Sequence, residues 1–164
     1  MKIEFEKLTA RIARYERQEE KQRLAWAKSN SSAIKTLRAK LLDIGGNSIS
    51  PQPHPYIRFI ADHGRPQDFP AIIRVMKPSD CHGNVFELWV NRTKRSRLVA
   101  ICIGYALTDD GDGGMWCPHS WALRKTRGVV SIIETTVSRT KYFGIAYVPS
   151  PNSHKMPKGC GNCS

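Results

Sequence analysis

The spacing of apolar residues changes character close to Leu98, and this change restricts the folds open to the chain. Before this point, apolar side chains recur every three or four residues, the period of a helix that packs on one face. After it, the period becomes two, which is typical of strands. A helical part followed by consecutive strands indicates the α+β class. A chain of 164 residues is long enough for one such domain.

Two helices are predicted at the N-terminal end. Residues 2–28 carry one apolar stripe, formed by Phe5, Leu8, Ile12 and Tyr15. Ser32 is a candidate N-cap for a second helix, whose apolar positions are Ile34, Leu37, Leu41 and Ile44. Gly45 and Gly46 then favour a helix end. We therefore expect residues 1–46 to form a basic helical extension, folded as a helical hairpin.

The middle of the chain is predicted to contain one irregular segment and one helix. Residues 47–70 hold five of the ten prolines, with a possible strand at 56–60, and residues 71–76 suit a strand or short helix. A helix is predicted from Lys77 to about Lys94, with Ser79 as cap and Asp80 at the positive end of the dipole. Its buried stripe would consist of Cys81, Val85, Leu88 and Trp89, which places Cys81 in the first turn.

Four strands are predicted at 98–107, 116–124, 129–136 and 141–148, separated by short turns. We expect them to form an antiparallel meander. The predicted domain therefore covers residues 47–148, and residues 149–164 are interpreted as a flexible, cysteine-containing tail. The acidic and glycine-rich stretch at 109–114 favours a hairpin turn over a calcium loop, since it lacks the length of an EF-hand.

The chain is strongly basic, with a formal charge of +12 and a pI near 9.8. Such a charge suits a polyanionic partner, either nucleic acid or an acidic protein surface, and it also favours solubility. No apolar run resembles a signal peptide or a membrane span, so we expect a cytoplasmic protein without membrane contact. Five cysteines without a secretory signal are expected to be thiols rather than disulfides.

Three residues suggest a thiol-dependent active site. Cys81 opens a helix, where backbone N–H groups and the dipole stabilise a thiolate. His119 lies on a predicted strand and could accept and return the proton of the thiol. Glu134 lies on the next strand, where it could orient the imidazole and fix its tautomer. The hypothesis is therefore a Cys-His-Glu triad.

The order of these residues resembles the transglutaminase-like and papain-like thiol enzymes, including small bacterial and phage proteins. The matching segments are Cys81 at a helix start, Gly104-Tyr105-Ala106, His119-Ser120-Trp121 and Glu134-Thr135-Thr136. The chain departs from the pattern by Glu for Asp, by Thr135 for Pro, and by His82 where Trp usually follows the cysteine. The resemblance implies a papain/transglutaminase-like core, with Gln67 as candidate oxyanion donor. It also implies acyl transfer on protein or peptide amides: hydrolysis, deamidation or transfer to an amine.

The alternative function is a catalytically inactive, basic binding protein that contacts nucleic acid or an acidic partner. The N-terminal helices would supply the contact through Arg14, Arg17 and Lys21. Trp121 is a further candidate for substrate binding.

A structural zinc site is the remaining alternative, although no cofactor is expected for the thiol enzyme. Its ligands would be Cys117, His154, Cys160 and Cys163, with His119 as a competing ligand. A nucleoside deaminase is excluded, because no proline directly precedes Cys160 and no upstream His-x-Glu is present.

Overall fold

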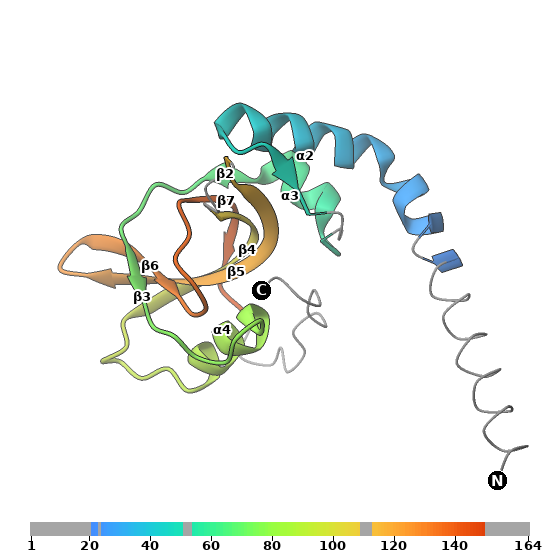
Figure 1. Cartoon of the computed structure of the whole chain (residues 1–164). Coiled ribbons are helices and arrows are strands. Elements are labelled where there is room, and N and C mark those ends of the chain that lie inside the picture. The colour runs from blue at the N-terminus through green and yellow to red at the C-terminus, as the bar shows by residue number, and fades with distance from the viewer. Residues whose placement is uncertain (1–20, 23, 51–53, 109–112, 150–164) are drawn as a thin grey trace, which may run out of the picture.

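The computed structural model describes residues 21–22, 24–50, 54–108 and 113–149, and it shows the predicted mixture of helices and sheet (Figure 1). The helices are α2 (Ser31–Ile44), α3 (Ile57–His63) and α4 (Cys81–Val90), and residues 21, 22 and 24–29 are also helical. The strands are β1 (Ser48–Ile49), β2 (Arg65–Pro66), β3 (Ala71–Ile73), β4 (Leu98–Thr108), β5 (Met115–Thr126), β6 (Val129–Glu134) and β7 (Lys141–Tyr147). The α+β class is confirmed.

All strands join one sheet in the order β2-β7-β4-β5-β6-β3, with β1 paired to β5. The pairs β3–β6 and β1–β5 are parallel, and the others are antiparallel. The four long strands lie close to their predicted positions. The predicted meander is wrong in one respect, because β7 pairs with β4 instead of β6. After β6 the chain therefore crosses to the far side of β4.

A pair of glycines allows β4 and β7 to approach closely. Gly104 faces Gly144 in the register of the two strands. A Cβ atom on Gly104 would lie 2.1 Å from the Phe143 carbonyl oxygen, and one on Gly144 would lie 2.9 Å from the Trp121 ring. Any larger residue would have to push the backbones or this ring aside. The absence of a side chain at Gly144 thus leaves space for the ring of Trp121.

The helices differ in detail from the predictions. Residues 56–60 do not form a strand, because Ile57, Ile60 and Ala61 are buried together on one face of α3. A spacing of three and four places these side chains on one helical stripe. Helix α4 is shorter than predicted, and its N-cap is Asp80, which accepts a hydrogen bond from the Gly83 N–H at 3.1 Å.

Helix α2 begins at Ser31, one residue before the predicted cap, and its N-cap Asn30 makes no side-chain capping hydrogen bond. Its end at Gly45 agrees with the prediction, since Gly45 and Gly46 both have positive φ angles. Leu37 and Leu41 of α2 are buried in the same cluster as Tyr105, Trp116 and Phe143 of the sheet. Helix α2 is therefore part of the core that the sheet forms.

The two faces of the sheet have different coverings. One face packs on α2 and α3, and further along on α4, where Val85 and Trp89 contact Ile101, Ala122 and Ile133. The other face carries a separate cluster, formed by Ala100, Cys102, Ala106, Trp121, Leu123, Ile132 and Tyr142. Because successive strand residues point to opposite faces, each position on β5 belongs to one of these two environments.

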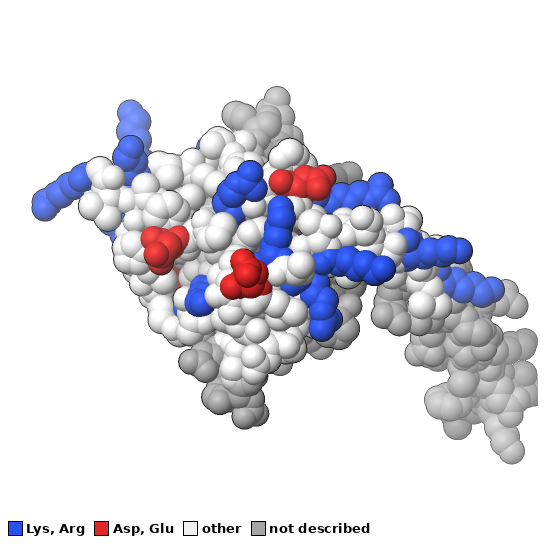
Figure 2. Space-filling model, turned by 90° about the horizontal axis from the view of Figure 1, so that it is seen from above, with Lys and Arg blue, Asp and Glu red and all other residues white. Residues whose placement is uncertain are grey.

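No helix in the described part of the chain is both long and apolar enough to cross a bilayer. The predictions for residues 2–20 and 150–164, which include most of the first helix and nearly all of the tail, lie outside the described residues. Seen from above, Lys and Arg side chains outnumber acidic ones on the face formed by α2 and the helix before it (Figure 2).

Candidate active site

His119 and Glu134, two of the three predicted catalytic residues, form a buried pair. The Nε2 atom of His119 lies 2.8 Å from Oε2 of Glu134, and the side chains are 1% and 0% exposed. The two residues lie on β5 and β6, which pair in antiparallel register. A carboxylate can only accept here, so Nε2 carries the proton and donates it to Glu134. In the neutral ring Nδ1 is then the basic nitrogen.

Glu134 is held by further donors. Its Oε1 accepts hydrogen bonds from the backbone N–H and the hydroxyl of Thr136, both at 2.9 Å, and its Oε2 accepts one from the Tyr142 hydroxyl at 3.0 Å. Burial by itself would raise the pKa of this carboxyl. The hydrogen bonds and charge of His119, together with the bonds from Thr136, outweigh burial and lower the pKa to about 2. Glu134 is therefore a carboxylate throughout the neutral range.

The other ring nitrogen of His119 has no hydrogen-bond partner among the described residues, although it is buried. The ring stacks on Trp121 with 6.2 Å between centroids and lies 6.5 Å from the ring of Tyr142. An unpartnered polar atom in the interior costs about 1–3 kcal/mol. The Nδ1 atom is thus the one part of this network that is open to a further partner.

Cys81 is the first residue of α4, as predicted, and its side chain is 8% exposed. Burial raises the pKa of the thiol to about 11, and the Glu134 charge also raises it. Hydrogen bonds from the backbone of Ser120 and His82, and the charge of Arg139, act in the opposite direction. The sulfur therefore lies against the β5 backbone, directly beside the residue that carries the imidazole.

No hydrogen bond joins Cys81 to His119. Ser120 and Ala122 point toward α4, whereas His119 and Trp121 point to the other face of the sheet. In the structure, His119 is therefore hydrogen-bonded to Glu134, and Cys81 contacts the backbone of Ser120. The Cys81 sulfur and the His119 imidazole do not form a hydrogen bond.

Sequence reasoning missed a second polar cluster on the α4 side of the sheet. The Ser120 hydroxyl lies 2.5 Å from Nδ1 of His82, and the rings of His82 and His54 are 5.9 Å apart. Burial, and then the charge of His119, lowers the pKa of His82 to about 4. Burial, and then His82, lowers that of His54 to about 3. Both histidines are neutral at pH 7. His54, His82 and Ser120 are far apart in the sequence, so no local pattern indicates that they form a cluster.

Gln67 and Trp121 are joined by a hydrogen bond. The Gln67 Oε1 atom accepts from Trp121 Nε1 at 3.0 Å and from Cys102 Sγ at 3.5 Å, so it lies on the face of the sheet that carries His119. A cavity of about 440 Å³ opens beside Gln67, Arg139 and Tyr142. Trp121 itself is fully buried, so it supports neighbouring side chains such as Gln67 and is not available for contact at the surface.

The remaining predicted site residues are only partly described. Arg14, Arg17, His154, Cys160 and Cys163 lie outside the described residues, while Lys21 is exposed. Cys117 is buried on β5. Within the described residues, no group of three or more His, Cys, Asp or Glu side chains is placed to hold a metal ion.

Comparison with known proteins gives no relative for this chain: no family model matches it, and neither does any curated protein or solved structure. The resemblance to transglutaminase-like enzymes therefore stays a prediction from the order of the motifs.

The two neutral histidines predict a loss of stability in mild acid. Below about pH 6.5 the unfolded chain takes up a proton on each, whereas the folded chain resists until about pH 4 for His82 and pH 3 for His54. Their contribution is thus complete above pH 6.5 and is lost as the pH falls. We expect the free energy of unfolding to decrease by up to about 1.4 kcal/mol per pH unit for each histidine.

Urea unfolding at several pH values between 7 and 4 measures this slope. Glu134 adds a second loss only at lower pH, because its contribution is complete above about pH 4.5 and disappears toward pH 2. The variant His54→Leu should show about half of the wild-type slope above pH 4.5. An unchanged slope in this variant would contradict the assignment.

Proposed function

We propose that the protein is a thiol-dependent hydrolase or acyltransferase that acts on protein or peptide amide bonds, with Cys81 as nucleophile, His119 as acid–base residue and Glu134 as the residue that positions His119. The observation that carries the proposal is the state of the His119 ring. Glu134 fixes its Nε2 atom, and Nδ1 is buried and has no hydrogen-bond partner among the described residues. The Cys81 thiol contacts the backbone of Ser120, the next residue along β5. Nδ1 is the nitrogen that a thiol requires as its base.

The chemistry follows from these groups. Transfer of the thiol proton to Nδ1 gives a thiolate and an imidazolium, and Glu134 stabilises the imidazolium through Nε2. The thiolate attacks the amide carbonyl carbon, and the C–N bond then breaks as the imidazolium protonates the leaving amine. A water molecule, or a second amine, then attacks the carbonyl carbon of the thioester while His119 takes its proton. The C–S bond breaks, the carboxylic acid or new amide leaves, and the proton returns to the sulfur of Cys81. Backbone N–H groups at the start of α4 are suited to stabilise the negative oxygen.

The proposal requires the start of α4 to move against β5, because the His119 side chain lies on the face of the sheet that points away from α4 and no hydrogen bond joins it to Cys81. Hydrogen bonds between catalytic groups are often long in free enzymes and shorten when substrate binds. If the Cys81 sulfur reached Nδ1 of His119, the thiol proton would give this nitrogen a hydrogen-bond partner. Transfer of the proton would then form an ion pair between the Cys81 thiolate and the His119 imidazolium. This approach would also change the acidity of Cys81, which makes the proposal testable without knowledge of the substrate.

Alkylation by iodoacetamide provides this test. A thiol that keeps the buried environment described above, with a pKa of about 11, would react slowly at neutral pH. The proposal predicts instead that Cys81 reacts ahead of the other thiols, with a rate that already rises below pH 8. Peptide mapping by mass spectrometry identifies the alkylated cysteine at each pH. In His119→Ala, the rise should move upward by at least about one pH unit, because the partner of the thiolate is lost.

Cys102 serves as an internal control for this experiment. It is fully buried on β4, and burial raises its pKa to about 12, so it should remain unmodified under the same conditions. Equal labelling of Cys81 and Cys102 would indicate unfolding. A Cys81 that reacts only near pH 11 would show that its resting environment persists and would refute the proposed function.

A further inference from the structure

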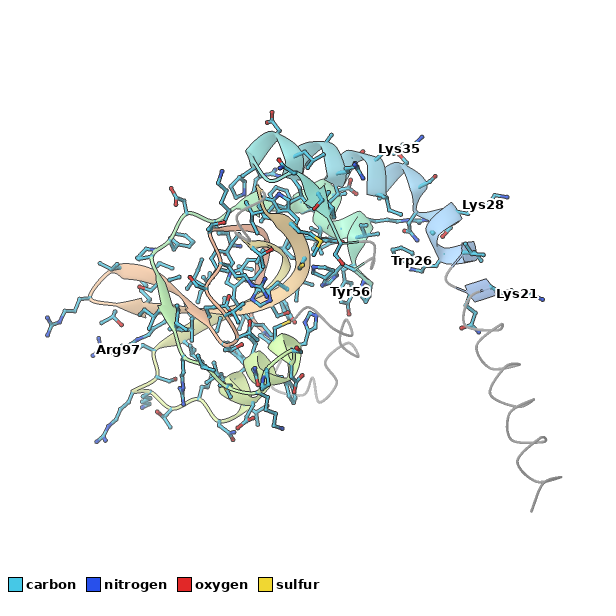
Figure 3. The ribbon with its side chains drawn as sticks, in the orientation of Figure 1. Lys21, Trp26, Lys28, Lys35, Tyr56 and Arg97 are labelled. Atoms are coloured by element: carbon cyan, nitrogen blue, oxygen red, sulfur yellow. The ribbon has the colours of Figure 1, made fainter. Side chains whose placement is uncertain are left out.

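Basic residues are frequent in the loop that follows α4 and in the β5–β6 hairpin, far along the chain from the N-terminal helices. The loop 91–97 and the β5–β6 hairpin are joined by a hydrogen bond from the Lys125 N–H to the Arg97 carbonyl at 3.0 Å. With Arg74, these segments form what we call the arginine surface: Arg74, Arg92, Lys94, Arg95, Arg97, Arg124, Lys125 and Arg127. Figure 3 shows Arg97 on the opposite side of the molecule from Lys21 and Lys28.

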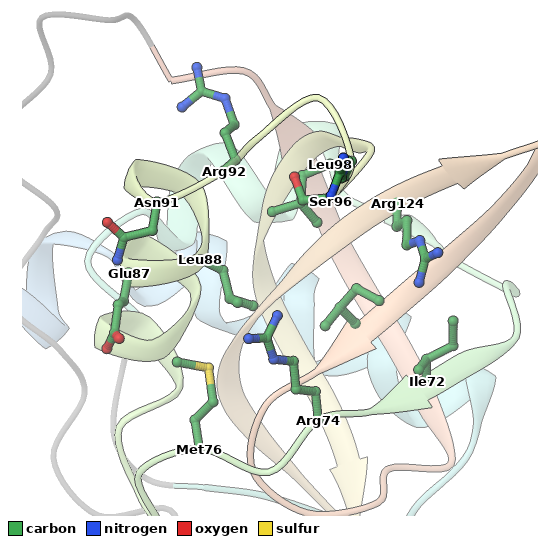
Figure 4. Close-up of a pocket in the computed structure, with 12 residues that line it drawn as sticks. Ile72, Arg74, Met76, Glu87, Leu88, Asn91, Arg92, Ser96, Leu98 and Arg124 are labelled. Atoms are coloured by element: carbon green, nitrogen blue, oxygen red, sulfur yellow. The ribbon is translucent and has the colours of Figure 1, made fainter.

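Four residues of the arginine surface line a cavity of about 300 Å³ between α4 and the sheet. Figure 4 shows Arg74, Arg92 and Arg124 arranged around it, and Arg95 also lines it. The apolar part of the lining consists of Ile72, Met76, Leu88, Leu98 and Ile133. The one acidic residue in the lining is Glu87, so the charged side chains sum to four positive minus one negative, or +3.

The guanidinium groups around this cavity are not neutralised by the described part of the protein. None of the four forms an ion pair with a described carboxylate. Arg92 lies 4.0 Å above the Trp89 ring and donates to the Trp89 carbonyl, and Arg124 donates to Thr126 Oγ1. Each guanidinium has five N–H donors, so most of these donors remain available to an anion.

We propose that the arginine surface binds single-stranded nucleic acid, with phosphates on the arginines and a base in the cavity. Guanidinium groups match the geometry of phosphate oxygens by paired hydrogen bonds, and six of the eight cations are arginines. The aliphatic side chains of the floor offer an apolar contact to the face of an unstacked base, whereas the base faces of a duplex are covered by their neighbours. An acidic peptide would complement the charge but would leave this floor without a matching group.

Fluorescence anisotropy with a labelled oligothymidylate of about 20 nucleotides tests the proposal on the full chain. The variant Arg74→Glu/Arg95→Glu/Arg124→Glu removes three cations from the cavity. Its matched control, Lys28→Glu/Lys35→Glu/Arg38→Glu, makes the same change of charge on exposed positions of α2 and the helix before it. We expect the cavity variant to bind at least about tenfold more weakly and to lower the slope of log affinity against log salt by about 2.

The control variant and Cys81→Ala should both bind within about threefold of the wild type, which separates this proposal from the thiol chemistry. Far-ultraviolet circular dichroism confirms that both triple variants are folded. Equal weakening by the two triple variants would overturn the assignment, as would absence of binding at about 50 mM salt. Tighter binding of a duplex, or displacement of the oligonucleotide by polyglutamate at equal charge, would also overturn it.

Discussion

Replacement of Cys81 with alanine is expected to lower the rate of p-nitrophenyl acetate hydrolysis by about a thousandfold or more relative to the intact chain. This ester is a general probe for acyl transfer and requires no knowledge of the substrate. The proposed attack forms a thioester at the Cys81 sulfur, so mass spectrometry of the wild-type protein should also find one acetyl group on the peptide that contains Cys81. Alanine removes the sulfur atom that would carry this acetyl group.

Matched variants separate the proposed roles in this reaction. His119→Ala should lower the rate by about 10²–10⁴, the usual contribution of a general acid–base residue. Cys117→Ala removes another buried thiol from β5, two residues from His119, and should leave the rate nearly unchanged. Hydrolysis that persists in Cys81→Ala, or that is lost equally in Cys117→Ala, would contradict the assignment of the nucleophile.

Glu134→Ala is expected to lower the free energy of unfolding by about 3–5 kcal/mol at neutral pH, because one partner of a buried charged network is removed. The mutation would leave His119 Nε2, the Tyr142 hydroxyl and both donors of Thr136 without their acceptor. Glu134 is 0% exposed, so the donors that lose their acceptor are buried. Urea unfolding followed by tryptophan fluorescence measures the loss.

Two further variants define the cause of this effect. Glu134→Gln keeps the size of the side chain and one acceptor oxygen, and it should cost less than the alanine variant. Glu87→Ala removes an exposed carboxylate from α4 and should change stability by less than about 0.5 kcal/mol. A loss below about 1 kcal/mol in Glu134→Ala would mean that the network contributes little to stability.

The strands from residue 98 onward could be located from sequence because turns and alternation are local properties. The turn at Arg127-Gly128, for example, separates β5 from β6 as predicted, and both residues have positive φ angles. The start of α4 was also visible, although Asp80 rather than Ser79 provides the cap. In contrast, the sequence indicates a possible strand at 56–60, where the structure has α3. Its three prolines upstream and its short length obscured a helical spacing that burial against α2 stabilises.

The pairing of β7 with β4 could not be read from the sequence. A meander and a crossover use the same strands and the same turns, and they differ only in which strand edges meet. The choice depends on contacts across the fold, such as the Gly104–Gly144 approach and the hydrogen bond between Tyr142 and Glu134. The cluster of His54, His82 and Ser120 is hidden for the same reason.

By itself, the sequence determined the fold class, the helix that begins at Cys81 and the placement of His119 and Glu134 on neighbouring strands. These follow from periodicity and capping, which act over a few residues. Only the tertiary structure decided that Glu134 holds Nε2 of His119, that Nδ1 has no partner in the described part of the chain, and that arginines from three segments line one cavity. Hydrogen bonds and charges act over a few ångströms in space, and the sequence does not state which distant residues come that close.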